Sequence, residues 1–179
     1  MPSYLVIPGI QGDSQAREHE GSIEIESWSF GVTQAEAPAS ATGSGRGRPT
    51  FSAVTFACRG GRASPLLLQF CATGRHAAQA VLTQQSGTGL QAARTEVRFT
   101  DVRIVDYTAS GGEADTRDEF RLGFARVTFS VRAQLADGAL ADAISTTQPA
   151  TILPVAPPPI PTPGSGGVWR PRDQQVPKR

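Results

Sequence analysis

The chain has 179 residues, of which 17 are basic and 16 acidic, so its formal net charge is +1. This length fits one domain with some chain left over, because folded domains cluster near ~100–150 residues. A nearly balanced charge argues against a dedicated nucleic-acid or membrane-surface binder, since such proteins concentrate charge of one sign, and we expect no nucleic-acid partner.

The start of the chain, MPSYLVIPG, carries no basic segment, and its apolar run is shorter than the ~7–15 residues of a signal peptide. Nowhere do ~20 apolar residues follow one another, so we expect neither a Sec signal peptide nor membrane insertion. Two cysteines, Cys58 and Cys71, are too few for a disulfide framework. Reduced thiols in a cytoplasm are the preferred interpretation, although the sequence leaves open whether the two ever pair.

The body of the chain is predicted to be mostly β-structure. Its strand-like segments are rich in Val, Ile, Phe, Thr and Trp and are bounded by turn residues. A further run, from His76 to Gln85, is a weaker strand candidate because of its alanines. The four main predicted strands are Ser22–Gln34, Thr50–Cys58, Thr95–Tyr107 and Phe120–Leu135.

One helix is predicted, from Ser64 to Gly74. Serine at the N-cap, Pro65 at the first helical position and glycine just past the end each stand where the physics of helix ends favours them. Leu67, Phe70 and Cys71 would share one face of this helix.

The long strands change their apolar face part-way. Ile23 and Ile25 occupy odd positions in the first strand, whereas Trp28 and Phe30 occupy even ones. A strand cannot change faces without a bulge, a bend or burial on both sides. Similar changes in the other strands indicate an antiparallel β-barrel, and a sandwich whose strands cross between sheets is the alternative. The predicted residues of the barrel core or of a protomer interface are Trp28, Phe30, Phe124, Val127 and Phe129.

Two segments differ in composition from the rest. Ala35–Pro49 is rich in glycine and small residues and is predicted to be a long loop between strands. From Pro149 onward proline recurs nine times, which favours extended or disordered chain because proline cannot donate backbone hydrogen bonds. We therefore divide the chain into a β-barrel domain, 1–146, and a proline-rich tail, 147–179.

The sequence predicts no catalytic residue, no cofactor and no metal. His19 lies in a charged turn and is interpreted as solvated, while His76 is expected to meet the last carbonyls of the helix. The cysteines and histidines lack zinc-ligand spacing, and the loop glycines lack the Gly-Lys-Ser/Thr ending of a phosphate loop. An enzyme acting through His19, Glu24 or Glu26 is the disfavoured alternative.

Several short motifs occur in a fixed order along residues 3 to 140. They are IQGDS at Ile10–Ser14, His19 with Gly21 and Ile23, SWSFGV at Ser27–Val32, SPLL at Ser64–Leu67, CATGRH at Cys71–His76 and FARV at Phe124–Val127. In this order they resemble the Hcp family, the haemolysin-coregulated tube proteins of bacterial type VI secretion systems.

This resemblance implies a β-barrel with one short flanking helix that assembles as a homo-hexameric ring. Rings would stack into an inner tube that waits in the bacterial cytoplasm until contraction of a sheath expels it from the cell. Contractile sheath, VgrG-like spike and effector proteins are the implied partners. The loop residues implied in ring stacking are Gly43, Gly45, Arg46, Gly47 and Arg48.

The tail after about Thr146 has no counterpart in the plain tube protein. An alternative function is therefore a specialised ring that carries or chaperones secreted effectors, or that docks on the spike through its tail.

Overall fold

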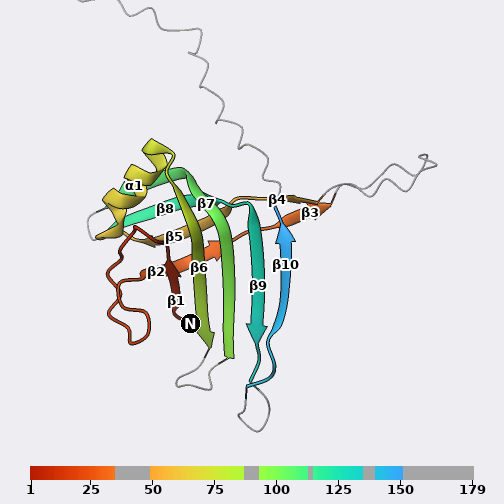
Figure 1. Cartoon of the computed structure of the whole chain (residues 1–179). Coiled ribbons are helices and arrows are strands. Elements are labelled where there is room, and N and C mark those ends of the chain that lie inside the picture. The colour runs from red at the N-terminus through yellow and green to blue at the C-terminus, as the bar shows by residue number, and fades with distance from the viewer. Residues whose placement is uncertain (35–48, 87–92, 113–114, 135–139, 151–179) are drawn as a thin grey trace, which may run out of the picture.

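The computed structural model describes residues 1–34, 49–86, 93–112, 115–134 and 140–150. These residues form antiparallel strands and one helix (Figure 1). In chain order the elements are β1 (Ser3–Val6), β2 (Ile23–Ser29), β3 (Val32–Gln34), β4 (Pro49–Phe51), β5 (Val54–Arg59), α1 (Ala63–Thr73), β6 (His76–Ser86), β7 (Ala93–Gly111), β8 (Thr116–Gly123), β9 (Arg126–Arg132) and β10 (Ile144–Pro149).

The strands close into a barrel through the long strand β7. Neighbouring strands follow the order β7-β6-β1-β2-β5-β8, and β8 pairs with β7 again, so the ring of hydrogen bonds is complete. Strands β9 and β10 branch from β7 as an extension, which we call the wing. The predicted antiparallel barrel with one short helix is confirmed, and the sandwich alternative is excluded.

Two of the predicted face changes occur inside strands. The register between β2 and β5 shifts between Ile25 and Ser27, which is the signature of a β-bulge. In β7 the buried residues change from Val97 and Phe99 to even positions beyond Asp101, whose φ of 52° is left-handed. Bends at these places let a curled sheet close on itself.

The other two face changes are breaks between strands. The first predicted strand is also interrupted, without a second face change, so three predicted long strands are each two shorter ones. The predicted strand Phe120–Leu135 divides into β8 and β9 at Phe124–Ala125. The predicted strand Thr50–Cys58 divides at Ser52–Ala53, and the first predicted strand divides at Phe30–Gly31. Periodicity alone does not distinguish a bulge from a break, because both reverse the buried face.

Aromatic rings fill the centre of the barrel. Phe99 on β7 is fully buried and lies 6.4 Å from Phe56 and 5.0 Å from Phe124 between ring centroids. Phe56 in turn stacks on Phe120 at 5.3 Å. The largest fully buried apolar side chains are Phe56, Phe99, Phe120, Leu5, Leu67, Leu82, Leu122, Val54, Val97 and Val102.

Helix α1 begins earlier than the sequence predicts. Its N-cap is Arg62, and Ser64 lies within the first turn, where its hydroxyl accepts a hydrogen bond from the Gly61 N–H at 2.9 Å. The Arg62 N–H is bound by the Asp13 carboxylate at 2.8 Å. Pro65 is tolerated here because the first N–H groups of a helix have no partner within the helix.

The predicted end of the helix is confirmed. Gly74 is left-handed, with a φ of 64°, and its N–H donates to the carbonyl of Cys71. The Arg75 N–H donates to the carbonyl of Phe70 at 3.1 Å, which completes a Schellman motif. Leu67 and Phe70 are buried as predicted, whereas Cys71 is only half-buried.

Gly74→Ala is expected to destabilise the protein by about 1 kcal/mol, because a side chain makes the left-handed conformation unfavourable. No atom lies within 4 Å of the added Cβ, so the cost is conformational and not steric. Urea denaturation measures it. Gly111→Ala is the matched control, since that position is also open but its φ is not positive. Equal losses for both variants would contradict this explanation.

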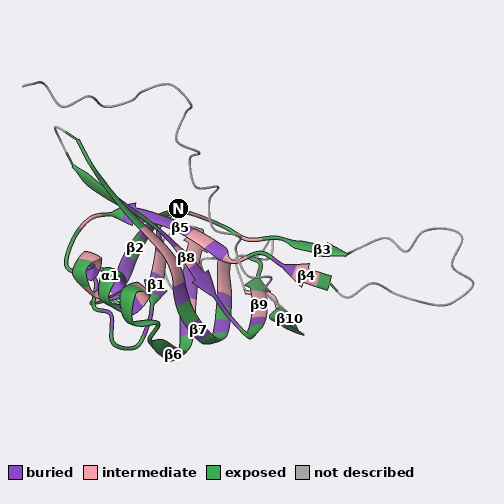
Figure 2. Cartoon of the chain, turned by 90° about the horizontal axis from the view of Figure 1, so that it is seen from above, coloured by how far each residue is buried: buried purple, intermediate pink, exposed green. Residues whose placement is uncertain are grey.

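The wing and a small ribbon stand out from the barrel. Every residue of β10 is exposed, and β3 and β4 form a two-stranded ribbon that projects beyond the barrel (Figure 2). Strand β10 runs past Thr146 to Pro149, and the Ala150 N–H donates to the Ala125 carbonyl at 2.8 Å. Pro149 fits there because an edge strand tolerates a residue without an N–H. The rest of the predicted tail, 151–179, lies outside the described residues.

Candidate functional site

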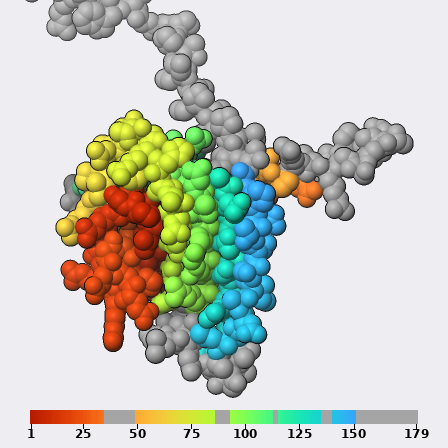
Figure 3. Space-filling model, viewed as in Figure 1, coloured from red at the N-terminus to blue at the C-terminus, as the bar shows by residue number. Residues whose placement is uncertain are grey.

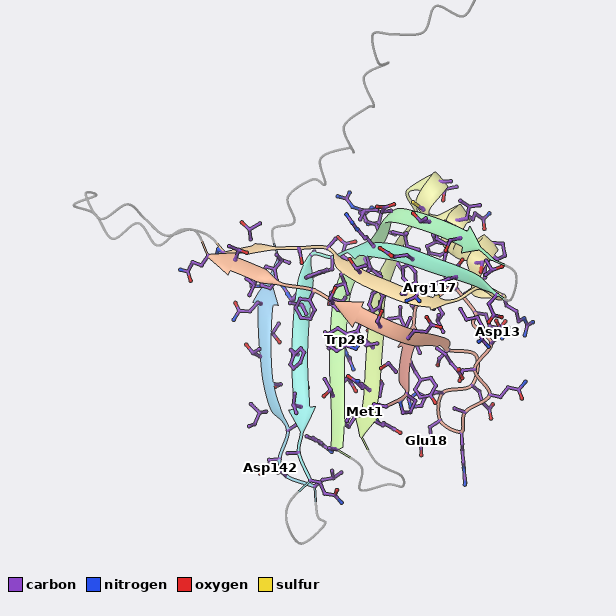
Figure 4. The ribbon with its side chains drawn as sticks, turned by 180° about the vertical axis from the view of Figure 1, so that it is seen from behind. Met1, Asp13, Glu18, Trp28, Arg117 and Asp142 are labelled. Atoms are coloured by element: carbon purple, nitrogen blue, oxygen red, sulfur yellow. The ribbon has the colours of Figure 1, made fainter. Side chains whose placement is uncertain are left out.

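The inner side of the wing carries an apolar surface that the barrel covers only in part. We call this surface the aromatic face. Its aromatic members come from β2, β9 and the turn after β2, and Figure 4 shows Trp28 from this side. Its residues are Trp28, Phe30, Phe129, Val131 and Ile144.

The rings of the aromatic face form a continuous row. Phe30 lies 6.2 Å from Trp28 and 6.4 Å from Phe129 between ring centroids, and all three rings are half-buried against the core. Ile144 lies opposite Val131 in the β9–β10 register and is 81% exposed. Large apolar side chains grouped on a protein surface mark a site of association.

A hollow of about 580 Å³ continues this surface at the base of the β3–β4 ribbon. Phe30, Phe51 and Arg121 contribute to its walls. Ser52 fixes the base of the ribbon, because its hydroxyl accepts the Gly31 N–H at 2.8 Å and its own N–H donates to the Gly31 carbonyl at 2.9 Å. The aromatic face and this hollow together form a concave, largely apolar surface on which a neighbouring molecule can pack.

A buried polar cluster joins the start of α1 to the barrel. Asp118 on β8 is fully buried and accepts hydrogen bonds from the hydroxyls of Ser64 and of Tyr107, the latter at 3.1 Å. Acidic residues that stand close together in a β-protein are usually solvated, and Asp118 is an exception to this expectation. A buried carboxylate is stable only when donors surround it, so this cluster fixes the helix against β7 and β8.

The neighbours of Asp118 stay protonated. Burial, followed by the hydrogen bond and charge of Asp118, raises the pKa of Tyr107 to about 12. Burial and the same charge raise the pKa of the Cys58 thiol to about 12. A thiol is reactive as its thiolate, so Cys58 is a structural residue at neutral pH. Both cysteines are free.

His19 is not solvated, and that prediction is wrong. Its side chain is 9% exposed and stacks on Tyr4 of β1 with ring centroids 4.2 Å apart. The loop before β2 folds back on itself through bonds between the Gly12 N–H and the Gly21 carbonyl and between the Ser14 N–H and the Ser22 carbonyl. This folding carries the imidazole onto the sheet.

The stability contributed by His19 is expected to fall as the pH is lowered. Burial, then Arg94, lowers the pKa of His19 below its ordinary 6.5, while Glu18 opposes them. The unfolded chain therefore binds the proton more readily, so this contribution is complete above pH 6.5 and is lost progressively below it. Urea titrations of wild type and His19→Asn, from about pH 5 to about pH 8, measure it. The difference in the free energy of unfolding between wild type and His19→Asn should shrink at low pH, whereas a constant difference would contradict this expectation. His76→Asn, which changes an exposed histidine, is the control.

The other candidate residues make surface contacts. His76 does not meet the helix carbonyls as predicted, because its Nδ1 lies 3.0 Å from Asp101 Oδ1. Glu26 pairs with Arg117 at 3.4 Å. Among the described residues, no group of histidine, cysteine and carboxylate side chains has the arrangement of a metal site, and no helix is long and apolar enough to cross a membrane. The predicted stacking residues Gly43, Gly45, Arg46, Gly47 and Arg48 lie outside the described residues.

Comparison with known proteins identifies the family. The family model described as "Type VI secretion system effector, Hcp" matches residues 4–131. Protein hcp1 of Pseudomonas aeruginosa is 30% identical over 139 residues, which are 76% of this chain and 86% of that protein. The chain belongs to the Hcp family.

Solved structures share the fold of this Hcp-family chain. Hcp1 from Salmonella typhimurium is 25% identical with a TM-score of 0.68, and the similarity covers 83% of this chain and 93% of that one. A type VI secretion system effector from Yersinia pestis is 24% identical with a TM-score of 0.67, covering 83% and 99%. The resemblance that the sequence motifs indicated is confirmed.

The residues predicted as Hcp barrel core or protomer interface fall into two groups. Phe124 and Val127 are buried in the core, whereas Trp28, Phe30 and Phe129 are half-buried in the aromatic face. Sequence reasoning missed two further members of that face. Val131 could have been found, because it alternates with Phe129 along β9, but Ile144 stands in a polar stretch that gave no strand signal.

Proposed function

We propose that this Hcp-family chain is the structural subunit of a type VI secretion inner tube, built from stacked hexameric rings. The observation that carries the proposal is a closed barrel whose wing leaves an aromatic face uncovered. An isolated protomer with such a surface would aggregate, whereas a neighbouring copy can cover it. Ring closure then limits the contact to a fixed number of copies.

The edge of the wing supports the same assembly. β10 is the last strand in the sheet order, so its outer edge is unpaired in the part of the chain that the structure describes. Unpaired edges are templates for pairing with another chain. Because β10 lies next to the aromatic face, one neighbouring protomer could pair with the edge of β10 and also cover the aromatic face.

Light scattering coupled to size exclusion, with negative-stain microscopy of the full chain, tests the proposal. We expect a species of six times the chain mass that appears as an annulus. A protein that stays monomeric at every concentration would sink the proposal.

Stacking of rings is assigned to the loop between β3 and β4. The ribbon that β3 and β4 form projects away from the barrel, which supports a role in stacking for the segment that joins these two strands (Figure 2). Replacing residues 36–47 by a short Gly-Ser turn should leave ring mass unchanged and abolish longer tubes in microscopy. Unchanged tube formation would refute this role of the loop.

The proposed route is assembly in the bacterial cytoplasm and expulsion by a contracting sheath, with the spike and effectors as further partners. The family is one of secreted proteins by name, which supports this route. The alternative role, as an effector carrier or as a spike adaptor through residues 147–179, uses the same ring. Deleting the chain after Ala150 should leave the ring intact and remove a co-purifying partner if that alternative holds.

A further inference from the structure

The outer face of the sheet is chemically unlike the aromatic face. Because Val97 and Phe99 of β7 point into the core, the alternate residues Arg94, Glu96 and Arg98 point outward. This outward face runs across β6, β7, β9 and β10, which lie side by side in Figure 3. Basic and hydroxyl side chains dominate its β7, β9 and β10 part.

Arginines on this face oppose one another. Arg94 of β7 lies directly opposite Arg132 of β9, and like charges in such pairs destabilise a sheet unless something compensates them. Glu96 is shared, with its carboxylate 3.6 Å from the Arg94 guanidinium and 3.1 Å from that of Arg98. Within the described ranges Arg132 has no ion-pair partner, so positive charge is in excess here.

A hollow of about 330 Å³ lies between the opposed arginines. Arg94, Glu96, Ser130, Arg132 and Ala143 line it. Arg94 Nε is buried, and the residues that the structure describes provide no hydrogen-bond acceptor for it. A carboxylate from another molecule in the hollow would therefore offset the excess positive charge. We call this place the arginine hollow.

We propose that the arginine hollow binds carboxylate side chains of an acidic polypeptide segment. Two arginine forks and the Ser130 hydroxyl are donors that match the geometry of a carboxylate. In the ring of the proposed function, on which this step rests, copies of the hollow would repeat around the annulus. Repetition converts weak single contacts into useful avidity for one acidic partner.

A nucleic acid fits this surface less well. Sites for single strands combine arginines with aromatic side chains on which bases stack. The outward positions of β7 up to Thr100, of β9 and of β10 hold arginine, glutamate, serine, threonine and proline, with no aromatic residue among them.

Fluorescence anisotropy of the full chain with labelled hexaglutamate tests the proposal, with hexaglutamine and oligo-dT as comparison probes. We expect hexaglutamate to bind in low salt, to be released by high salt and to prefer the protein over both comparison probes. Arg132→Gln should weaken binding by at least roughly tenfold. Arg59→Gln, which removes an exposed arginine paired with Asp115, should leave binding unchanged.

Equal binding of hexaglutamine, tighter binding of oligo-dT, or an unaltered Arg132→Gln variant would each overturn the proposal. Ring mass is measured on the same samples. If Arg132→Gln no longer forms rings, the arginine serves contacts between protomers and the proposal is also overturned. If the wild type forms no ring yet binds hexaglutamate through Arg132, the proposed function is wrong and the proposed binding of carboxylates in the arginine hollow is supported.

Discussion

Replacing Phe99 by alanine is expected to lower the free energy of unfolding by about 4 kcal/mol. The ring is fully buried, and it touches rings on three sides, from Phe30, Phe56 and Phe124. Its loss leaves a cavity at the place where the barrel and the wing meet. Urea or thermal denaturation of the purified variant measures the change.

The control for this variant is Leu68→Ala, since Leu68 on α1 is 54% exposed and should matter by no more than about 0.5 kcal/mol. If Phe99→Ala does not fold, Phe99→Leu retains most of the volume and should show a smaller loss. A loss under about 1 kcal/mol for the alanine variant would mean that the centre of the core lies elsewhere.

Replacing Ile144 by glutamate is expected to abolish ring formation while sparing the protomer. In the free protomer the side chain is 81% exposed, so stability should change by no more than about 1 kcal/mol. In the proposed ring the same side chain is covered, and burial of an unpaired charge opposes association. We expect association to weaken by at least about a hundredfold, which corresponds to about 2.7 kcal/mol.

Light scattering and denaturation of the same preparation separate the two effects. Leu68→Glu is the matched control, because it places the same charge on α1, away from the aromatic face. Rings that survive Ile144→Glu would show that the wing is not part of the protomer contact. A variant that fails to fold would show that β10 supports the barrel itself, and Ile144→Thr would then report on association.

The closure of the sheet could be predicted because its signal is local. The apolar face reverses near Ser27 within a few consecutive residues, and the structure has a β-bulge at this place, between Ile25 and Ser27. The same holds for Gly74, whose position after an apolar run fixes the helix end. Local patterns of this kind depend on neighbours in the chain, so they can be read before the fold is known.

The hydrogen bonds of Asp118 and the place of Ile144 could not be predicted in this way. One hydroxyl that binds Asp118 comes from Ser64, 54 residues away, so the sequence near Asp118 does not show the donor that compensates its burial. The alternation of Asp118 with Phe120 and Leu122 along β8 is the local sign that it faces the core. The sequence of β10 shows no alternation of apolar and polar residues, because both faces of this strand are exposed in the protomer. Its strand exists through pairing with β9, which is a long-range contact.

The partner exchange along β7 has a mechanical consequence. The strand pairs with β9 up to Thr100 and with β8 from Arg103 onward, with the left-handed Asp101 between the two partners. Force applied to the wing therefore travels along a continuous backbone into the seam that closes the barrel, with no flexible connector to absorb it. A subunit pushed or twisted at its edge would respond as a single stiff body.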